Sequence, residues 1–380
     1  MPPPQLQYLS QRRLWIFLLV LILFPAVTSH AKIFDVNVNG SASTKYNDNI
    51  TFTKDNRKSD VVSDLKIGLE LNQEGKTHSL DFEANIIQQI FGHYGEFNNV
   101  SENLAFKLKK ELTEHDNITL KDGFSHAEEP SSFEDAFGRT SGRYSTYRNN
   151  FGVIYNRDVT EQLSVHTDYT NDLTDFSLKS SSDTTAHKVG FGADYTLDSA
   201  TIFRPNYSFL RRNFDNGPSS DIHEFFTGIR RFLTSKLYLD LEPGIGWISG
   251  YDDQNYTRPR YRAALSYDLD DKTVTGISYE RSYSTNAYTQ DLFDNWRVAA
   301  NWIAQLSSRL QATFTSFVGE GRYVNSGNKQ RILGSAVGLN YELTKNSQTS
   351  VAYSFSQQDD KNGTSSYTQN LLMLALTFKF

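Results

Sequence analysis

Cysteine is absent from the 380 residues, which excludes disulfide bonds, thiolate metal sites and cysteine nucleophiles. No single sign of charge dominates, since 38 lysines and arginines accompany 44 acidic residues, and this balance argues against nucleic acid as a partner. After residue 31 no stretch is apolar enough to form a membrane-spanning helix. Any crossing of a bilayer by this chain must therefore be made by strands.

Aromatic residues are abundant in an otherwise polar chain. The sequence has 26 phenylalanines and 21 tyrosines, yet its mean hydropathy is −0.52. This combination is typical of a β-barrel whose lumen-facing side chains are polar and whose lipid face carries aromatic girdles.

The first 31 residues have the features of a secretory signal peptide. Arg12 and Arg13 precede the apolar run Leu14–Phe24, and the small-residue site Ser29–Ala31 follows. This core of about 11 residues is shorter than the roughly 18 to 20 that a spanning helix needs. We expect a cleaved signal peptide over residues 1–31 and one barrel domain over residues 32–380, with an uncleaved membrane anchor as the alternative.

Apolar and polar residues alternate along most of the remaining chain. Leu237, Leu239 and Leu241, for example, alternate with Tyr238 and Asp240, so that each set lies on one face of a strand. Segments of this kind are about 9 to 16 residues long and are separated by turn signals. They predict an all-β fold, a transmembrane antiparallel up-and-down barrel of outer-membrane type with about 18 strands, 16 being the alternative.

The chain ends in such a strand, because Leu372, Leu374, Leu376, Phe378 and Phe380 share one face. A final phenylalanine after a membrane strand resembles the C-terminal assembly signal of Gram-negative outer-membrane barrels, with Phe378 and Phe380 as the candidate residues. An open sheet edge in hydrocarbon leaves unpaired amides and carbonyls that cost several kcal/mol each. We therefore expect the last strand to pair with the first, near residues 33–46.

Connections alternate in length. Short turns, such as Glu74–Lys76 and Thr113–Asp116, alternate with longer polar loops, such as Asn47–Arg57 and Asp175–Asp183. Outer-membrane barrels have short periplasmic turns and longer outer loops. An even number of strands then places both termini on the periplasmic side.

The polar face of each predicted strand supplies a candidate pore wall that carries both signs of charge. Its main candidates are Lys66, Glu70, Arg148, Asp168, Asp194, Arg204, Asp240, Glu242, Arg260, Arg262, Glu280 and Arg297. Asp81, Glu83, Lys107, Lys109, Lys121, Lys188 and Asp268 fall on the same face. A ring of one sign would select ions by charge, whereas a mixed wall offers hydrogen-bond partners to a neutral or weakly charged polyol. Such charges can also pair across strands and simply solvate the wall.

Three polar features have a chemical and a plainer interpretation. Ser164, His166 and Asp168 are the parts of an acyl-transfer triad, but same-face neighbours on one strand lie nearly 7 Å apart, too far for its hydrogen bonds. The segment Tyr46–Asn56 has oxygen ligands of the type that calcium prefers, although ordinary Asx turns explain it better. The loop Ala127–Ser141 is either a gate over the mouth or a solvated surface loop. We expect no enzyme activity, no cofactor and no metal site.

Two short motifs resemble the "β-barrel porin 2" family of outer-membrane proteins. One is Tyr46-Asn47-Asp48-Asn49-Ile50, in which Asn47 replaces the Asp typical of the family, and the other is Gly75–Leu80. Members often belong to exopolysaccharide biosynthesis and export, so the resemblance implies an outer-membrane pore of such a system, without catalytic residues.

The sequence thus predicts a conduit for exopolysaccharide export across the Gram-negative outer membrane. A diffusion porin for small solutes and a structural or adhesive barrel are the alternatives. The expected partners are outer-membrane lipid, the barrel assembly machinery, a polysaccharide, and a periplasmic or inner-membrane export partner that delivers it. Nucleic acid is not expected.

Overall fold

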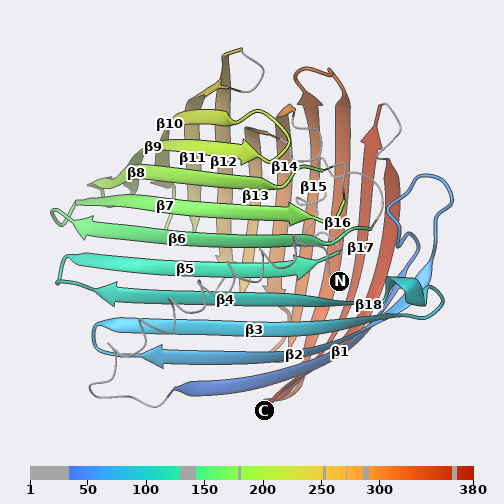
Figure 1. Ribbon diagram of the computed structural model, residues 1–380. Helices are drawn as coiled ribbons and strands as arrows, with labels where there is room; N and C mark the ends of the chain where they lie inside the picture. The colour runs from blue at the N-terminus through green and yellow to red at the C-terminus, as the bar shows by residue number, and fades with distance from the viewer. Residues whose placement is uncertain are drawn as a thin grey trace, which may run out of the picture.

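Eighteen antiparallel strands form one closed sheet (Figure 1). The computed structural model describes residues 34–128, 143–178, 181–250, 254–270, 272–285, 291–361 and 366–380. The strands are β1 (Asp35–Asn47), β2 (Asp60–Glu74), β3 (His78–Phe91), β4 (Asn99–Glu111), β5 (Asp116–Ala127), β6 (Thr146–Asp158), β7 (Leu163–Phe176), β8 (Thr184–Asp198), β9 (Thr201–Phe214), β10 (Ser220–Phe232), β11 (Leu237–Ser249), β12 (Tyr256–Asp270), β13 (Thr273–Thr285), β14 (Leu292–Gln305), β15 (Leu310–Tyr323), β16 (Lys329–Thr344), β17 (Ser347–Asp360) and β18 (Tyr367–Lys379). A short 3-10 helix, η2 (Gly95–Phe97), lies between β3 and β4. Within the described ranges, no helix is long and apolar enough to cross a membrane.

Closure is made by β18, which returns to pair with β1 from Asn39 opposite Lys379 to Asn47 opposite Leu371. At the end of the chain, the Phe380 N–H donates to the Val38 carbonyl at 2.8 Å. The predicted pairing of the last strand with the first is confirmed, and so is the barrel of 18 strands; the alternative of 16 is wrong. In Figure 1 the strands of the front wall cross those of the back wall steeply, as tilted barrel strands must.

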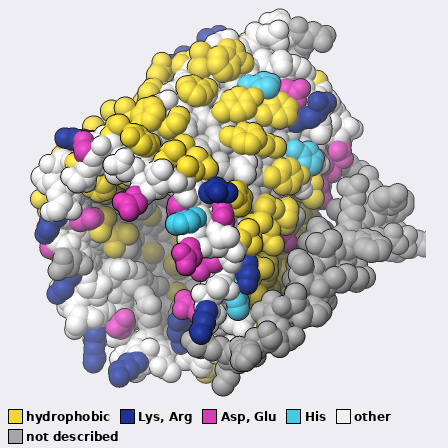
Figure 2. All heavy atoms as spheres, turned by 90° about the vertical axis from the view of Figure 1, so that its left-hand side faces the viewer, with side chains coloured by type: hydrophobic (Ala, Val, Ile, Leu, Met, Phe, Trp, Pro, Cys, Tyr) yellow, Lys and Arg dark blue, Asp and Glu magenta, His cyan; other side chains and the backbone are white. Residues whose placement is uncertain are grey.

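Large hydrophobic side chains lie exposed on one face of the sheet. Ile67 is 70% exposed, Leu374 57% and Phe380 78%, and Ile67 alternates along its strand with Lys66 and Gly68. Figure 2 shows such side chains in a broad area of the outer surface. An apolar belt around the barrel is the surface that hydrocarbon requires and water disfavours.

The polar residues lie on the concave face. Arg204 of β9 reaches Asp240 of β11 at 4.0 Å, and Arg260 of β12 reaches Glu224 of β10 at 3.9 Å. Each contact passes over an intervening strand, which is possible where side chains converge inside a curved sheet. The charged face therefore surrounds the lumen.

The two ends of the barrel differ in the length of the loops that connect the strands. Short turns such as Thr113–Asp116, where the Thr113 hydroxyl donates to the Asp116 carboxylate at 2.7 Å, lie at the end that also holds the C-terminus. The longer connections lie at the other end. The predicted signal peptide and nearly all of the loop Ala127–Ser141 lie outside the described residues.

Candidate functional site

A row of alternating charges runs across four successive strands of the lumen wall. Glu242, Arg262, Glu280 and Arg297 are register neighbours on β11 to β14. Arg262 Nη1 lies 2.8 Å from Glu242 Oε1, and Arg297 Nη2 lies 3.3 Å from Glu280 Oε2. These four predicted wall residues neutralise one another, so this row provides polarity without a strong field of one sign.

A second charged group joins β8 to β11. Arg230 donates two hydrogen bonds to Asp240, at 2.7 and 2.8 Å, and Arg204 lies 3.3 Å from Asp194. Arg230 was not among the predicted candidates, because β10 alternates weakly and places Phe226 on the same concave face. The more exposed Arg204–Asp194 pair contributes at most about 1 kcal/mol, whereas Asp240 is buried, so the loss of Arg230 would leave a buried charge without its partner.

The arginines near the long-loop end of β12 have fewer carboxylates close to them than those further along the strand. The Arg260 guanidinium lies 4.3 Å from the centroid of the Phe226 ring, with its nearest carboxylate, that of Glu224, at 3.9 Å. Arg258 lies two residues nearer the start of β12. Its guanidinium is 5.3 Å from the centroid of the Tyr256 ring and makes no ion pair within the described part of the chain. On β12, positive charge therefore increases towards this mouth.

Two apolar clusters narrow the same mouth. The ends of β13 and β14 bring Tyr283 and Leu292 against Ile222 and Ile248 of the concave wall. The loop after β1 brings Ile50 against Val62 and Phe91, and Arg143 donates to the Ile50 carbonyl at 3.2 Å. The opening is thus reduced by folded segments of the wall and of the first loop.

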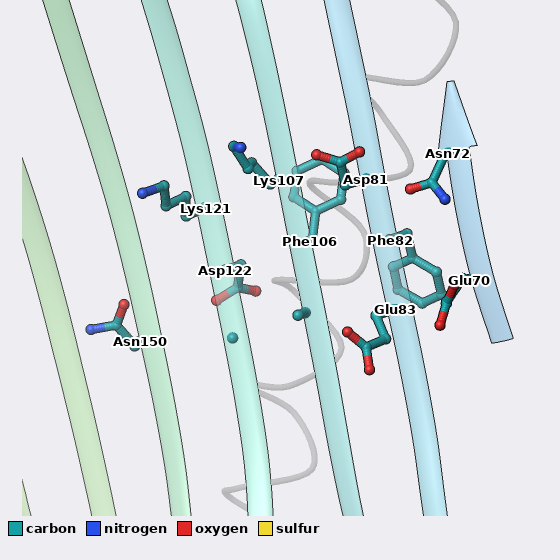
Figure 3. A pocket seen from close by; sticks show the side chains of 12 residues that line it. Glu70, Asn72, Asp81, Phe82, Glu83, Phe106, Lys107, Lys121, Asp122 and Asn150 are labelled. Carbon is teal, nitrogen blue, oxygen red and sulfur yellow. The ribbon is translucent and has the colours of Figure 1, made fainter. Parts of the chain in front are cut away.

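A recess of about 400 Å³ lies in the wall between β2 and β6 (Figure 3). It is lined by Glu70, Asn72, Asp81, Phe82, Glu83, Ala105, Phe106, Lys107, Lys121, Asp122, Gly123 and Asn150. By strand alternation, Phe82, Phe106 and Asp122 belong to the convex face and the others to the lumen. Glu70 was a leading wall candidate, and Glu83, Lys107 and Lys121 were assigned to the same face.

The remaining predicted residues lie apart from these groups. Lys66 and Arg148 lie on β2 and β6, and Asp168 lies over Gly190 of β8, where a Cβ would collide with its carboxylate. His166 contacts Asn206 Nδ2 at 3.3 Å through Nε2. The two side chains of the suspected triad therefore contact different strands, since His166 contacts Asn206 of β9 and Asp168 lies over Gly190 of β8. The transport roles of the wall residues stay predictions.

The family-like motif, which begins in the last two residues of β1, closes the seam of the barrel. The Asp48 carboxylate accepts from the Asn370 backbone N–H at 2.6 Å and from its side-chain amide at 2.7 Å. The Asn49 N–H donates to Asn47 Oδ1 at 2.9 Å, which is the Asx turn expected as the plainer interpretation. The described residues contain no group of three or more His, Asp or Glu placed to hold a metal ion.

Comparison with known proteins places the fold among solved barrels. No protein-family model and no curated protein matches the chain. The crystal structures of Pseudomonas aeruginosa OccK2 (OpdF) and OccK3 (OpdO) both superpose with a TM-score of 0.51, at 9% and 12% identity, over 91% of this chain and 98% and 96% of theirs. Acinetobacter baumannii OccAB3 gives 0.50 at 10% identity, over 91% of this chain and all of its own.

These likenesses concern the fold. At identities this low they establish the closed antiparallel barrel of the outer-membrane Occ porins and no more. The resemblance to the "β-barrel porin 2" family stays a prediction.

Proposed function

We propose that this chain forms an outer-membrane pore through which small polar solutes diffuse passively. One observation carries the proposal: a closed sheet of 18 strands has an apolar convex face and a charged concave face. Such a sheet leaves no edge in hydrocarbon and is wide enough to hold water in its lumen.

The wall also favours modest selectivity. Glu242, Arg262, Glu280 and Arg297 alternate in sign around part of the lumen, so a cation and an anion of similar size meet similar fields there. Glu83, Lys107 and Lys121 are exposed, so water reaches the recess. We expect the pore to select solutes weakly by charge and more strongly by size, the latter at the narrowed mouth.

Export of an exopolysaccharide, which the family resemblance implies, has less support. It rests on two short motifs, and the export partners remain predictions. If a null strain lost its secreted polysaccharide while small-solute uptake stayed unchanged, export would replace diffusion as the better account.

Liposome swelling tests the proposal. Vesicles that contain the folded, purified protein should swell in neutral sugars at rates that fall as the sugar grows. Protein-free vesicles and vesicles with heat-unfolded protein serve as controls. Rates equal to those controls for every sugar would leave a structural or adhesive barrel as the better interpretation.

A further inference from the structure

The recess between β2 and β6 contains two pairs of like charges. Glu70 and Glu83 lie directly opposite each other in the register of β2 and β3, and Lys107 and Lys121 do so in the register of β4 and β5. Like charges placed opposite each other on neighbouring strands are destabilising. This arrangement contrasts with the row of Glu242, Arg262, Glu280 and Arg297, in which the signs alternate.

The two pairs lie on opposite sides of a small open floor. Figure 3 shows the glutamates together on one side and the lysines on the other, with Asp81 beside Lys107. Ala105 and Gly123 follow Glu83 in the same register row and form the floor between them. A Cβ on Gly123 would have its nearest neighbour at 4.0 Å, so the space above the floor is free.

Neutral groups hold the carboxylates without cancelling their charge. Asn39 Nδ2 donates to Glu70 Oε1 at 3.0 Å, and the Asn85 amide donates to Glu83. Asp81 is the register neighbour of Lys107, yet no ion pair within 4.0 Å joins either lysine to a carboxylate among the described residues. On the lumen side, Glu70 and Glu83 therefore have no basic register neighbour, whereas Lys107 lies between Asp81 and Lys121 without forming an ion pair.

The spacing sets the length of a matching ligand. Glu83 and Lys107 lie on adjacent strands, two residues out of register. With strands about 4.8 Å apart and a rise of about 3.4 Å per residue, their Cα atoms are roughly 8 Å apart. Both side chains extend from these Cα atoms into the lumen, so a molecule with an ammonium and a carboxylate separated by a short chain can contact both charged groups.

We propose that this recess is a binding subsite for small zwitterionic solutes of the amino-acid type. The ammonium group lies against Glu70 and Glu83, and the carboxylate lies against Lys107 and Lys121. Such a solute compensates both like-charge pairs at once, whereas a singly charged ion compensates one pair and a sugar neither. The subsite deepens the proposed function and rests on it, because the solute reaches the recess through the lumen.

The probe is 4-aminobutanoate, which has no net charge and so carries no current. In planar bilayers with the full-length protein, it should reduce the potassium chloride conductance in a concentration-dependent way. Pentanoate, in which a methyl replaces the ammonium, should do so at least fivefold less well. The double variants Glu70→Gln/Glu83→Gln and Lys107→Gln/Lys121→Gln should each weaken the block at least fivefold. The matched control, Asp198→Asn/Arg231→Gln, removes an exposed opposite-charge pair at the short-turn end of the barrel and should keep it.

Saturation-transfer NMR on the folded protein in detergent micelles measures the same binding without conduction. Retained heat-modifiable migration in gels shows that each variant is folded. A conducting channel that neither binds 4-aminobutanoate nor distinguishes it from pentanoate overturns the subsite and leaves the pore intact. Binding that persists in both double variants also overturns it. A protein that binds the probe but conducts no ions refutes the proposed function instead.

Discussion

Replacing Asp48 with alanine should weaken the seam of the barrel at its long-loop end. The Asp48 carboxylate is the point at which the loop after β1 holds β18, through two short hydrogen bonds to Asn370. Neighbouring contacts support the same junction, since Asn49 Nδ2 donates to the Thr368 carbonyl at 2.9 Å and Gln369 Nε2 to Asn47 Oδ1 at 3.1 Å.

The expected loss of stability follows from the two hydrogen bonds that the substitution removes and from the backbone pairing that remains. Hydrogen bonds to a charged group contribute about 1.5 to 3 kcal/mol each, and Asp48 is only half-buried, which places the sum at the low end. The backbone ladder between β1 and β18 persists, since Tyr46 still pairs with Leu372. We expect the free energy of unfolding to fall by about 2 to 4 kcal/mol.

Urea unfolding in phospholipid vesicles, followed by tryptophan fluorescence, measures this loss. Asp55→Ala is the matched control, because Asp55 lies in the same loop and is exposed. Its midpoint should stay within error of the native protein. Equal midpoints for Asp48→Ala and Asp55→Ala would refute the inference that the motif stabilises the seam.

Three further outcomes follow from single positions. Deleting Phe380, whose N–H bonds the Val38 carbonyl, should lower the yield of heat-modifiable folded barrel while leaving the conductance of assembled molecules unchanged; normal assembly would contradict its role as a signal. Gly246→Ala should destabilise the barrel by about 1 to 3 kcal/mol in urea, because its Cβ would collide with the Tyr283 hydroxyl, whereas a Cβ on Gly95 would make only an ordinary contact with Asn98 Nδ2 at 3.8 Å. Asp122→Leu should raise the urea midpoint in vesicles, since Asp122 shares the convex face with its register neighbours Phe106 and Phe151; a lowered midpoint would place its carboxylate in water.

Alternation was enough to predict the fold. Because a strand exposes its two faces with a period of two, the sets around Leu237 and around Leu372 indicated both the strands and their lipid face. The number of strands followed from the count of alternating segments, and the pairing of the last strand with the first followed from the requirement that no edge remain in hydrocarbon.

The candidate site was only partly predictable, because its chemistry depends on register. The sequence assigned Glu83 and Lys107 to one face, but the opposition of Glu70 to Glu83, and of Lys107 to Lys121, appears only once the strands are aligned. Arg230 was missed because its strand alternates weakly. The seam contacts of Asp48 join residues more than 300 positions apart, and no local pattern indicates them.

Single-channel recording in planar bilayers tests the central claim most directly. The full-length protein, folded and inserted alone, should give stepwise increases of current in potassium chloride, with similar permeabilities for the cation and the anion. If the membrane contains protein that is shown to be folded and no current steps appear, the result would contradict an open, water-filled lumen.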